Sequence, residues 1–356
     1  MAILKYFLPT VCIALIFVTA CKNRNEVIHE SNNSVIASGK MPGVAIDNSE
    51  TIHVVYGKSD SLLYSYSSDQ GKTFSNPSLI SVVPKLMAKA MRGPQIVATT
   101  DGLSVTACNT SGDIFSFVKN RSGNWLPTAR VNDVDTVAKE NLMALSSDGQ
   151  IVFAVWLDLR NKHNQIFGSK STDGGKTWSK NIFMYASPDT TVCECCKPSV
   201  QVKGKDVYVM FRNWLQGNRD LYLIHSSDGG FHFEQAEKLG NGNWALNGCP
   251  MDGGALTLDN DGNPRTVWNR KGTIYACNPG AEEERVGEGN SCTVELINGK
   301  NTYAWVNKGN VIVQSPDGVQ KNLEKGELPI IKRINNDQII CIWQNDDQIH
   351  KAILSL

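Results

Sequence analysis

Hydrophobic and polar positions alternate along this chain in a way that predicts paired β-strands from residue 42 onward. Seven times, an apolar segment runs into a polar turn and then into a second segment that carries an aromatic residue or a cysteine. Asp-Gly and Asn-Gly pairs in several of the turns are strong signals for β-hairpins between apolar runs. The seven predicted hairpins cover residues 42–56, 94–108, 142–156, 198–211, 255–268, 292–305 and 329–343.

Further strands complete each unit. A third strand, such as 221–225, and a fourth, such as 233–239, follow the hairpin, and no segment shows helical periodicity. Repeated four-stranded units are typical of β-propeller blades, so we predict an all-β propeller with seven blades; six blades with irregular ends is the alternative. The last unit ends after its third strand at Leu354. Residues 27–36 could supply its fourth strand, because an open ring would leave two exposed sheet edges.

A short motif, S-x-D-x-G-x-x-aromatic, occurs three times, at residues 67–74, 171–178 and 226–233. It predicts a tight turn in which the Asp and Ser side chains bond to nearby backbone and Gly takes a positive φ. The motif resembles the Asp-box (BNR) repeat of sialidase-type β-propellers. As turns between third and fourth strands, these motifs share a face with the short hairpins. The opposite face, which carries the long loops, is therefore where we expect the functional site.

The N-terminal segment differs from the rest of the chain. An apolar run over residues 7–18 ends in Val18-Thr19-Ala20-Cys21, which is typical of a bacterial lipoprotein signal. We expect a signal peptide over residues 1–20, lipidation at Cys21, a tether over 21–40 and a propeller over 41–356. The expected location is the cell envelope, on the outer membrane, with contact to the membrane through the lipid alone. The formal net charge of +0 gives no reason to expect a nucleic-acid partner, and we expect a monomer.

The sialidase resemblance implies an exo-acting glycoside hydrolase for glycans or sialosides. In that family three arginines bind the sugar carboxylate, a tyrosine assisted by a glutamate is the nucleophile, and an aspartate is the acid/base. In family order, the resemblance implies Asp158 as the acid, Glu194 as the glutamate and Tyr303 as the nucleophile. The second and third arginines would be Arg212 and Arg270. Two features depart from the family: Lys40 stands where the first arginine is expected, although Arg92 could replace it, and Tyr303 begins a second strand.

A non-catalytic binding platform is the second hypothesis, and the missing first arginine favours it over full hydrolysis. Trp214 and Trp244 depart from the position that the strand tryptophans share, so they are candidates for stacking under a sugar ring. The residues expected to contact a ligand are Arg92, Arg160, Asn213, Trp214, Trp244 and Asp252. Neither hypothesis calls for a cofactor.

The chain has ten cysteines, which could form disulfides or bind a metal ion. Cys249 could form a disulfide with Cys193, Cys195 or Cys196, and Cys277 could pair with Cys292, because an exported protein permits disulfides. A soft-metal site for copper or zinc is the alternative to the first pairing, with ligands from Cys193, Cys195, Cys196, Cys249 and Met251. We favour disulfides.

Overall fold

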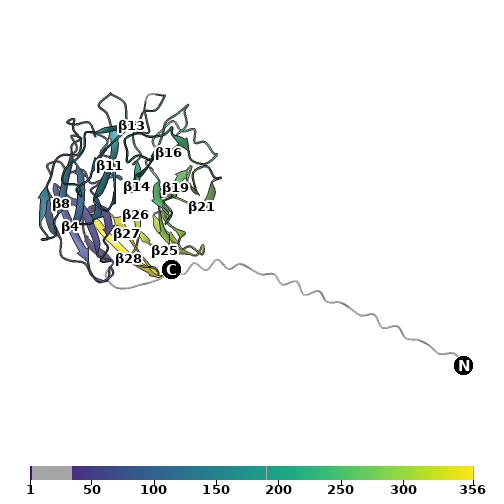
Figure 1. Cartoon of the computed structure of the whole chain (residues 1–356). Coiled ribbons are helices and arrows are strands. Elements are labelled where there is room, and N and C mark those ends of the chain that lie inside the picture. Colours follow the sequence, from purple (N-terminus) through teal and green to yellow (C-terminus); the bar gives the residue numbers. More distant parts are fainter. Residues whose placement is uncertain (2–33, 190, 356) are drawn as a thin grey trace.

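The computed structural model describes residues 1, 34–189 and 191–355 of the chain, and these residues form seven four-stranded sheets arranged in a ring (Figure 1). Every pair of neighbouring strands for which a register is defined is antiparallel, as in the third sheet, where Met143 lies opposite Trp156. The described residues contain no helix. The predicted all-β propeller of seven blades is therefore confirmed, and the six-blade alternative is wrong.

Six blades use their strands in chain order from the axis of the ring outward, and the seventh takes β1, from the N-terminal side of the chain, as its outer strand. The inner strands are β2 (Lys40–Ile46), β6 (Gln95–Thr99), β10 (Met143–Asp148), β14 (Ser199–Lys203), β18 (Ala255–Leu258), β22 (Asn290–Ile297) and β26 (Glu327–Arg333). The second strands are β3 (Ile52–Lys58), β7 (Gly102–Cys108), β11 (Ile151–Asp158), β15 (Asp206–Arg212), β19 (Pro264–Arg270), β23 (Lys300–Asn307) and β27 (Gln338–Asn345).

The outer half of each blade is less regular. The third strands are β4 (Ser61–Ser67), β8 (Ile114–Lys119), β12 (Gln165–Ser171), β16 (Leu221–Ser226), β20 (Thr273–Cys277), β24 (Asn310–Gln314) and β28 (Gln348–Ser355). The fourth strands are β5 (Ser78–Val82), β9 (Trp125–Pro127), β13 (Ile182–Tyr185), β17 (Glu237–Lys238), β21 (Glu284–Glu288), β25 (Gln320–Lys325) and β1 (Val35–Ser38).

The core lies between the blades. Each inner strand contacts the inner strands of both neighbouring blades, so the contacts run round the whole ring. The second strands are buried on both sides, which explains why they appear in the sequence as nearly continuous apolar runs. Their tryptophans, Trp156, Trp268, Trp305 and Trp343, are among the largest fully buried side chains and fill equivalent positions between sheets.

The ring is closed by the N-terminal side of the chain. β1 pairs with β28, and Val35 lies opposite His350 in the register. The backbone N–H of Lys351 also donates to the carbonyl of Ser34 over 2.7 Å. This strand covers residues 35–38 and overlaps the predicted 27–36 segment at residues 35 and 36, while residues 27–33 of that segment lie outside the described residues. It gives the last blade its fourth strand and leaves no unpaired edge on β28.

The three S-x-D-x-G turns join the third and fourth strands of their blades and share one geometry. In the turn after β12, Asp173 accepts bonds from the N–H groups of Lys176 and Thr177, and the Ser171 hydroxyl accepts one from Gly175 N–H. Gly175 has a φ of +91°, and its Cα faces Ser104 of the preceding blade. Trp178 packs against the core beneath the turn, as its position in the motif predicts.

The predicted signal peptide, and Cys21 with most of the tether, lie outside the described residues. Across the residues whose structure is described, we find no helix with the length and apolar character needed to cross a membrane.

Candidate functional site

A central channel, lined mainly by the inner strands, runs along the axis of the ring. Its cavity volume is about 690 Å³. At the loop end it is lined by Met41, Met91, Lys197, Asp252 and Ser291, where inner strands begin. Its wall carries mostly polar side chains farther along, among them Gln95, Gln201, Glu295 and Lys332. A concave, polar-lined cavity of this size is a suitable place for a small ligand.

The channel lining includes two lysines, Lys197 and Lys332, beside the carboxylates of Asp252 and Glu295. Lys197 Nζ donates to Gln95 Oε1 over 2.8 Å, and Lys332 Nζ lies 3.4 Å from Glu295 Oε2. Burial and the nearby Lys332 ammonium lower the pKa of Lys197 from its ordinary value to about 8. An anion bound beside these groups would offset both effects, because it would favour the charged form of Lys197.

Asp252 lies at the loop end of the same channel, and one of its carboxylate oxygens accepts two hydrogen bonds. Oδ2 accepts bonds from Asn269 Nδ2 at 3.1 Å and from the N–H of Ser291 at 3.0 Å. Burial raises the pKa of Asp252, although Arg212 and the two hydrogen bonds act in the opposite direction. Asp252 therefore links the channel to the buried arginine beside it.

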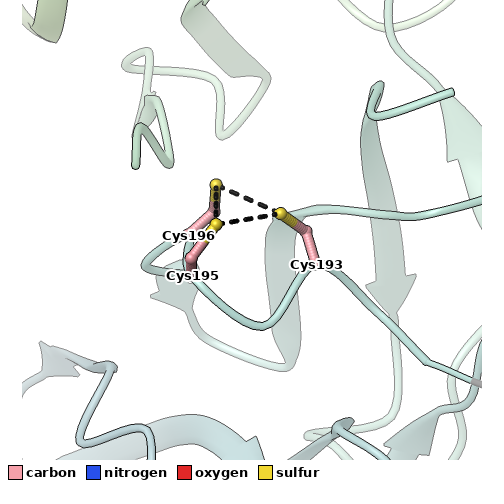
Figure 2. A group of neighbouring side chains, drawn as sticks. All are labelled: Cys193, Cys195 and Cys196. Carbon is pink, nitrogen blue, oxygen red and sulfur yellow. Dashed lines mark hydrogen bonds between the residues drawn. The ribbon is translucent and has the colours of Figure 1, made fainter. Parts of the chain in front are cut away.

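A cluster of cysteines lies next to this end of the channel, in the loop that leads into β14. The Sγ of Cys193 is 3.6 Å from that of Cys195 and 3.4 Å from that of Cys196 (Figure 2). Cys195 forms a disulfide with Cys249 from the loop before β18. The predicted pairing of Cys249 with one of these three cysteines is thus confirmed, and it joins the loops of two adjacent blades.

The thiols of Cys193 and Cys196 have different electrostatic surroundings. A hydrogen bond between Cys193 and Cys196, together with the guanidinium of Arg219, whose Nη1 is 3.0 Å from Cys193 Sγ, holds the pKa of Cys193 below its ordinary value. Burial and the neighbouring Cys193 raise the pKa of Cys196. The pair therefore consists of one thiol that ionises readily and one that stays protonated.

Arg212 was predicted to bind a substrate carboxylate, but its side chain is buried and hydrogen-bonded to the main chain. Its side chain is 1% exposed, and its three nitrogens donate to main-chain carbonyls. The acceptors are Asp252 at 2.9 Å, Arg219 at 2.8 Å and Asn269 at 3.0 Å. These bonds fix the loop end of β15 to the next blade, and they occupy the fork that a carboxylate would use.

Trp214 and Trp244 stack on arginines. The Arg219 guanidinium lies 4.5 Å from the Trp214 ring centroid, and that of Arg212 lies 5.2 Å from the Trp244 ring centroid. Asn213 is fully buried and donates to Tyr185 Oη. Glu194 pairs with Arg219 at 3.4 Å and is the more exposed partner. The structure thus brings Glu194, Arg212, Asn213, Trp214, Trp244 and Asp252 to one region around the cysteines.

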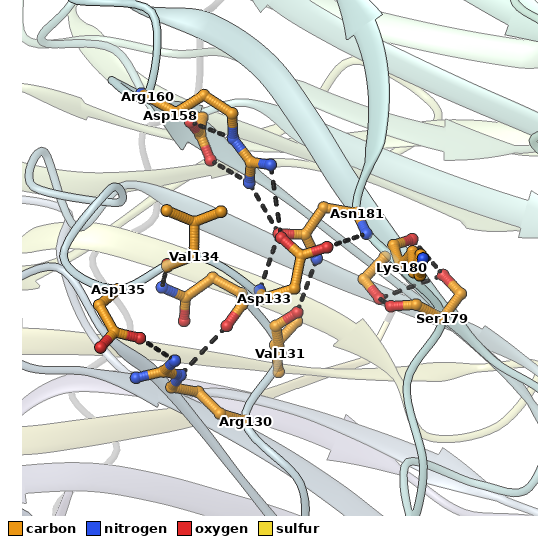
Figure 3. A network of polar contacts seen from close by, with 12 residues as sticks. Arg130, Val131, Asp133, Val134, Asp135, Asp158, Arg160, Ser179, Lys180 and Asn181 are labelled. Carbon is orange, nitrogen blue, oxygen red and sulfur yellow. Dashed lines mark hydrogen bonds and ion pairs between the residues drawn. The ribbon is translucent and has the colours of Figure 1, made fainter.

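Asp158 and Arg160 lie in a separate polar network (Figure 3). Asp158 is 0% exposed and accepts from Trp156 Nε1 at 2.8 Å and from Arg160 Nε at 2.9 Å. Arg160 also donates to Asp133 and Asn181. Both oxygens of Asp158 already have donors, so the carboxylate predicted as a general acid is held in an ion pair.

The remaining predicted catalytic and binding side chains are also engaged with protein atoms. Arg270 pairs with Glu283 through two nitrogens and lies over Tyr275. Tyr303 is buried between blades, and its hydroxyl accepts a bond from Asn301 at 2.8 Å. Arg92 donates to the carbonyl of Glu140 and lies 3.6 Å from its carboxylate.

One predicted disulfide is wrong. Cys277 and Cys292 are both free and buried, and they belong to different core clusters on opposite sides of the fifth blade's second and third strands. Cys277 instead lies 3.8 Å from the Thr266 hydroxyl. Two of the cysteines predicted as alternative metal ligands, Cys195 and Cys249, form a disulfide with each other and so have no free thiol. A further predicted ligand, Met251, is exposed at the surface.

Several residues of this region were not singled out from the sequence. Lys197, Arg219 and Gln95 are the main ones, and Lys332 and Glu295 complete the channel. The position of Lys197 directly before an inner strand was the available signal, because inner strands must surround the axis. Nothing in the local sequence indicates that Arg219 reaches Cys193.

Comparison with known proteins supports the fold. No protein-family model matches the sequence, and no curated protein is similar to it. Virginiamycin B lyase from Staphylococcus aureus has a similar structure, with a TM-score of 0.55, 11% identity and coverage of 91% of this chain and 97% of that one. An ulvan lyase described as a polysaccharide lyase gives a TM-score of 0.54, 11% identity and coverage of 90% and 95%.

A third structure of similar fold is a protein of unknown function from Dyadobacter fermentans, with a TM-score of 0.51, 14% identity and coverage of 91% and 96%. At such low identities these likenesses concern the fold alone. They are consistent with the seven-bladed ring.

Proposed function

We propose that this protein binds an acidic carbohydrate in its central channel, with Lys197 and Lys332 as the groups that contact the anion. The observation that carries the proposal is the pair of lysines in a polar cavity of about 690 Å³. Gln95, Gln201 and Ser291 add hydrogen-bonding groups of the kind that orient sugar hydroxyls. The ulvan lyase of similar fold is bound to a GlcA–Rha3S repeat, an anionic saccharide, which supports this class of ligand.

Recognition is a better description than sialidase-type hydrolysis. The guanidinium groups of Arg212 and Arg270 have protein partners, and Tyr303 is bonded to Asn301. Hydrolysis of a sialoside by Asp158, Glu194 and Tyr303 stays a prediction from the resemblance. It requires these side chains to exchange protein partners for substrate.

Titration calorimetry of the full chain with sialyllactose, a glucuronate-containing disaccharide and neutral lactose tests the proposal. We expect binding of an acidic sugar, no measurable binding of lactose, and a loss of about tenfold or more in affinity on Lys197→Gln. Lys176→Gln, a change at an exposed turn on the opposite face, should leave the affinity unchanged. Equal affinity for acidic sugar and lactose would contradict the proposal.

The pH dependence of binding is a second readout. Lys197 has a pKa near 8, so it is charged at pH 7 and loses its charge as the pH rises past 8. Affinity for the acidic sugar should therefore fall between pH 7 and pH 9 in the wild type and be flatter in Lys197→Gln. Turnover of a fluorogenic sialoside, measured in parallel, separates binding from hydrolysis.

We also propose that the protein is exported and carries a lipid at Cys21, on the basis of the sequence before that cysteine. Mass spectrometry of the N-terminal peptide from wild type and Cys21→Ser tests this. An unmodified wild-type peptide that begins at Met1 would rule the lipid anchor out.

A further inference from the structure

Four cysteines meet where the loop before β14 approaches the loop before β18. Two of them, Cys195 and Cys249, form a disulfide, and the other two, Cys193 and Cys196, are free thiols. The Sγ atoms of the two thiols are 3.4 Å apart, and Cys193 Sγ is 3.6 Å from Cys195 Sγ (Figure 2). A dithiol and a disulfide are thus held in van der Waals contact.

The four sulfur positions differ in access. Cys193 and Cys196 are at most 1% exposed, and Cys195 is 5% exposed, whereas Cys249 lies in an exposed part of its loop. Cys249 is therefore the member of the cluster that an external thiol or disulfide can reach. The other three exchange only with one another or through Cys249.

Cys193 is placed to attack. Arg219 Nη1 contacts its sulfur at 3.0 Å, and Arg219 is in turn fixed by Glu194 and by stacking on Trp214. A guanidinium in contact with sulfur stabilises the thiolate, which is the nucleophile in disulfide exchange. The Sγ of Cys196, the second thiol, lies 3.4 Å from the same sulfur. Cys108 and Cys341, by contrast, lie in apolar core clusters, and burial raises the pKa of both thiols.

We propose that Cys193, Cys195, Cys196 and Cys249 form a thiol–disulfide exchange site, in which the buried Cys193/Cys196 dithiol exchanges with the Cys195–Cys249 disulfide and exposed Cys249 connects the site to an external dithiol or disulfide.

The exchange takes two balanced steps. The Cys193 thiolate attacks Cys195 Sγ, so that a Cys193–Cys195 bond forms, the Cys195–Cys249 bond breaks and Cys249 leaves as a thiolate. Cys196, after losing its proton to that thiolate, attacks Cys193 Sγ and releases Cys195 as a thiolate. The net result is a Cys193–Cys196 disulfide and a Cys195/Cys249 dithiol, with no change in the number of electrons.

External coupling begins at Cys249. A dithiol in solution can reduce either disulfide form by two electrons and two protons, itself becoming a disulfide, and a disulfide in solution can reverse this. The fully reduced site holds four thiols, and oxidation by two electrons gives either internal disulfide.

Maleimide trapping tests the internal exchange. The purified full chain is incubated with N-ethylmaleimide at pH 7 without reductant, quenched in acid and mapped by peptide mass spectrometry. In the wild type we expect the maleimide on Cys249 together with a Cys193–Cys196 disulfide. Cys193→Ser should slow labelling of Cys249 by about tenfold or more, because the attacking sulfur is gone.

Cys196→Ser should still release Cys249 but stop after the first step, so a Cys193–Cys195 disulfide accumulates. Cys341→Ala removes a buried thiol from β27 and should label like the wild type. Cys341 of the wild type is buried, so its labelling measures global opening of the protein. The proposal requires Cys249 to be labelled faster than Cys341, because exchange within the cluster does not need global opening. This comparison needs no variant and holds even where a substitution impairs folding.

Two results would overturn the proposal. One is an intact Cys195–Cys249 disulfide in the wild type after Cys341 has become labelled. The other is stoichiometric zinc or copper in the purified protein with all four thiols protected, which would make the cluster a soft-metal site.

Discussion

A single buried arginine holds two blades together at the loop face. Arg212 donates to carbonyls from three different segments, and its buried guanidinium lies against the ring of Trp244. Removing the guanidinium would leave three buried carbonyls without donors, each at a cost of about 1–3 kcal/mol. Its role is to position Asp252 and the loop before β18.

We predict that Arg212→Met lowers the free energy of unfolding by about 3 kcal/mol or more. Arg285→Met is the matched control, because the Arg285 side chain is 61% exposed and forms a surface ion pair with Glu288. The control should change stability by about 0.5 kcal/mol or less. Chemical denaturation of the two variants measures both values. Equal, small losses would mean that the carbonyls find other donors.

At this scale the sequence is a weak guide to the site. Arg212, Arg270 and Asp158 have the residue types of a sialidase site in the right order, but residue type does not show whether a partner is a substrate or a carbonyl. The acceptors of Arg212 come from residues 219, 252 and 269, which only the folded ring brings together. Cys277 and Cys292 are near in sequence, but a strand separates their core clusters.

The S-x-D-x-G turn packs closely against the neighbouring blade. A Cβ added at Gly175 would lie 2.2 Å from Ser104 Oγ, and one at Gly230 would lie 2.6 Å from Phe153. Both contacted residues belong to the preceding blade. The third glycine, Gly71, faces Ile340 and Ile353 of the last blade in the same way. The motif therefore fixes blade spacing as well as local chain reversal.

We predict that Gly175→Ala destabilises the protein more than Gly318→Ala. Both glycines have a similar φ, +91° and +87°, but an added Cβ at Gly318 meets no atom within 4 Å. The backbone cost of about 1–2 kcal/mol is common to both, so the difference measures the contact with Ser104. Thermal unfolding of the two variants gives this difference. Equal melting temperatures would show that the blades do not require the close approach.

At the level of elements, the sequence was a good guide. All seven predicted hairpins correspond to the first and second strands of a blade, since Asp-Gly and Asn-Gly turns and the polarity alternation are local signals. Short outer strands such as β9 and β17 have little pattern of their own. Their pairing depends on the strand beside them.

At the scale of the whole molecule, ring closure depends on the short strand β1. We predict that a chain beginning at Lys40 melts at a lower temperature and aggregates more than a chain beginning at Ser34. The shorter chain lacks β1, so β28 becomes an exposed edge strand and Ala37 is lost from the core. Scanning calorimetry with light scattering measures both effects. Identical behaviour of the two chains would show that β1 is dispensable.

The pairing of β1 with β28 also sets an order for folding. The other blades can each form from one continuous stretch of chain, but the blade that contains β26, β27 and β28 needs both ends. Contacts so distant in sequence carry the largest entropy cost of closure and form late. The ring therefore cannot be completed until β28 is available to pair with β1. Until then the chain is an open arc with two uncovered blade faces, one of them formed by β2 and β3.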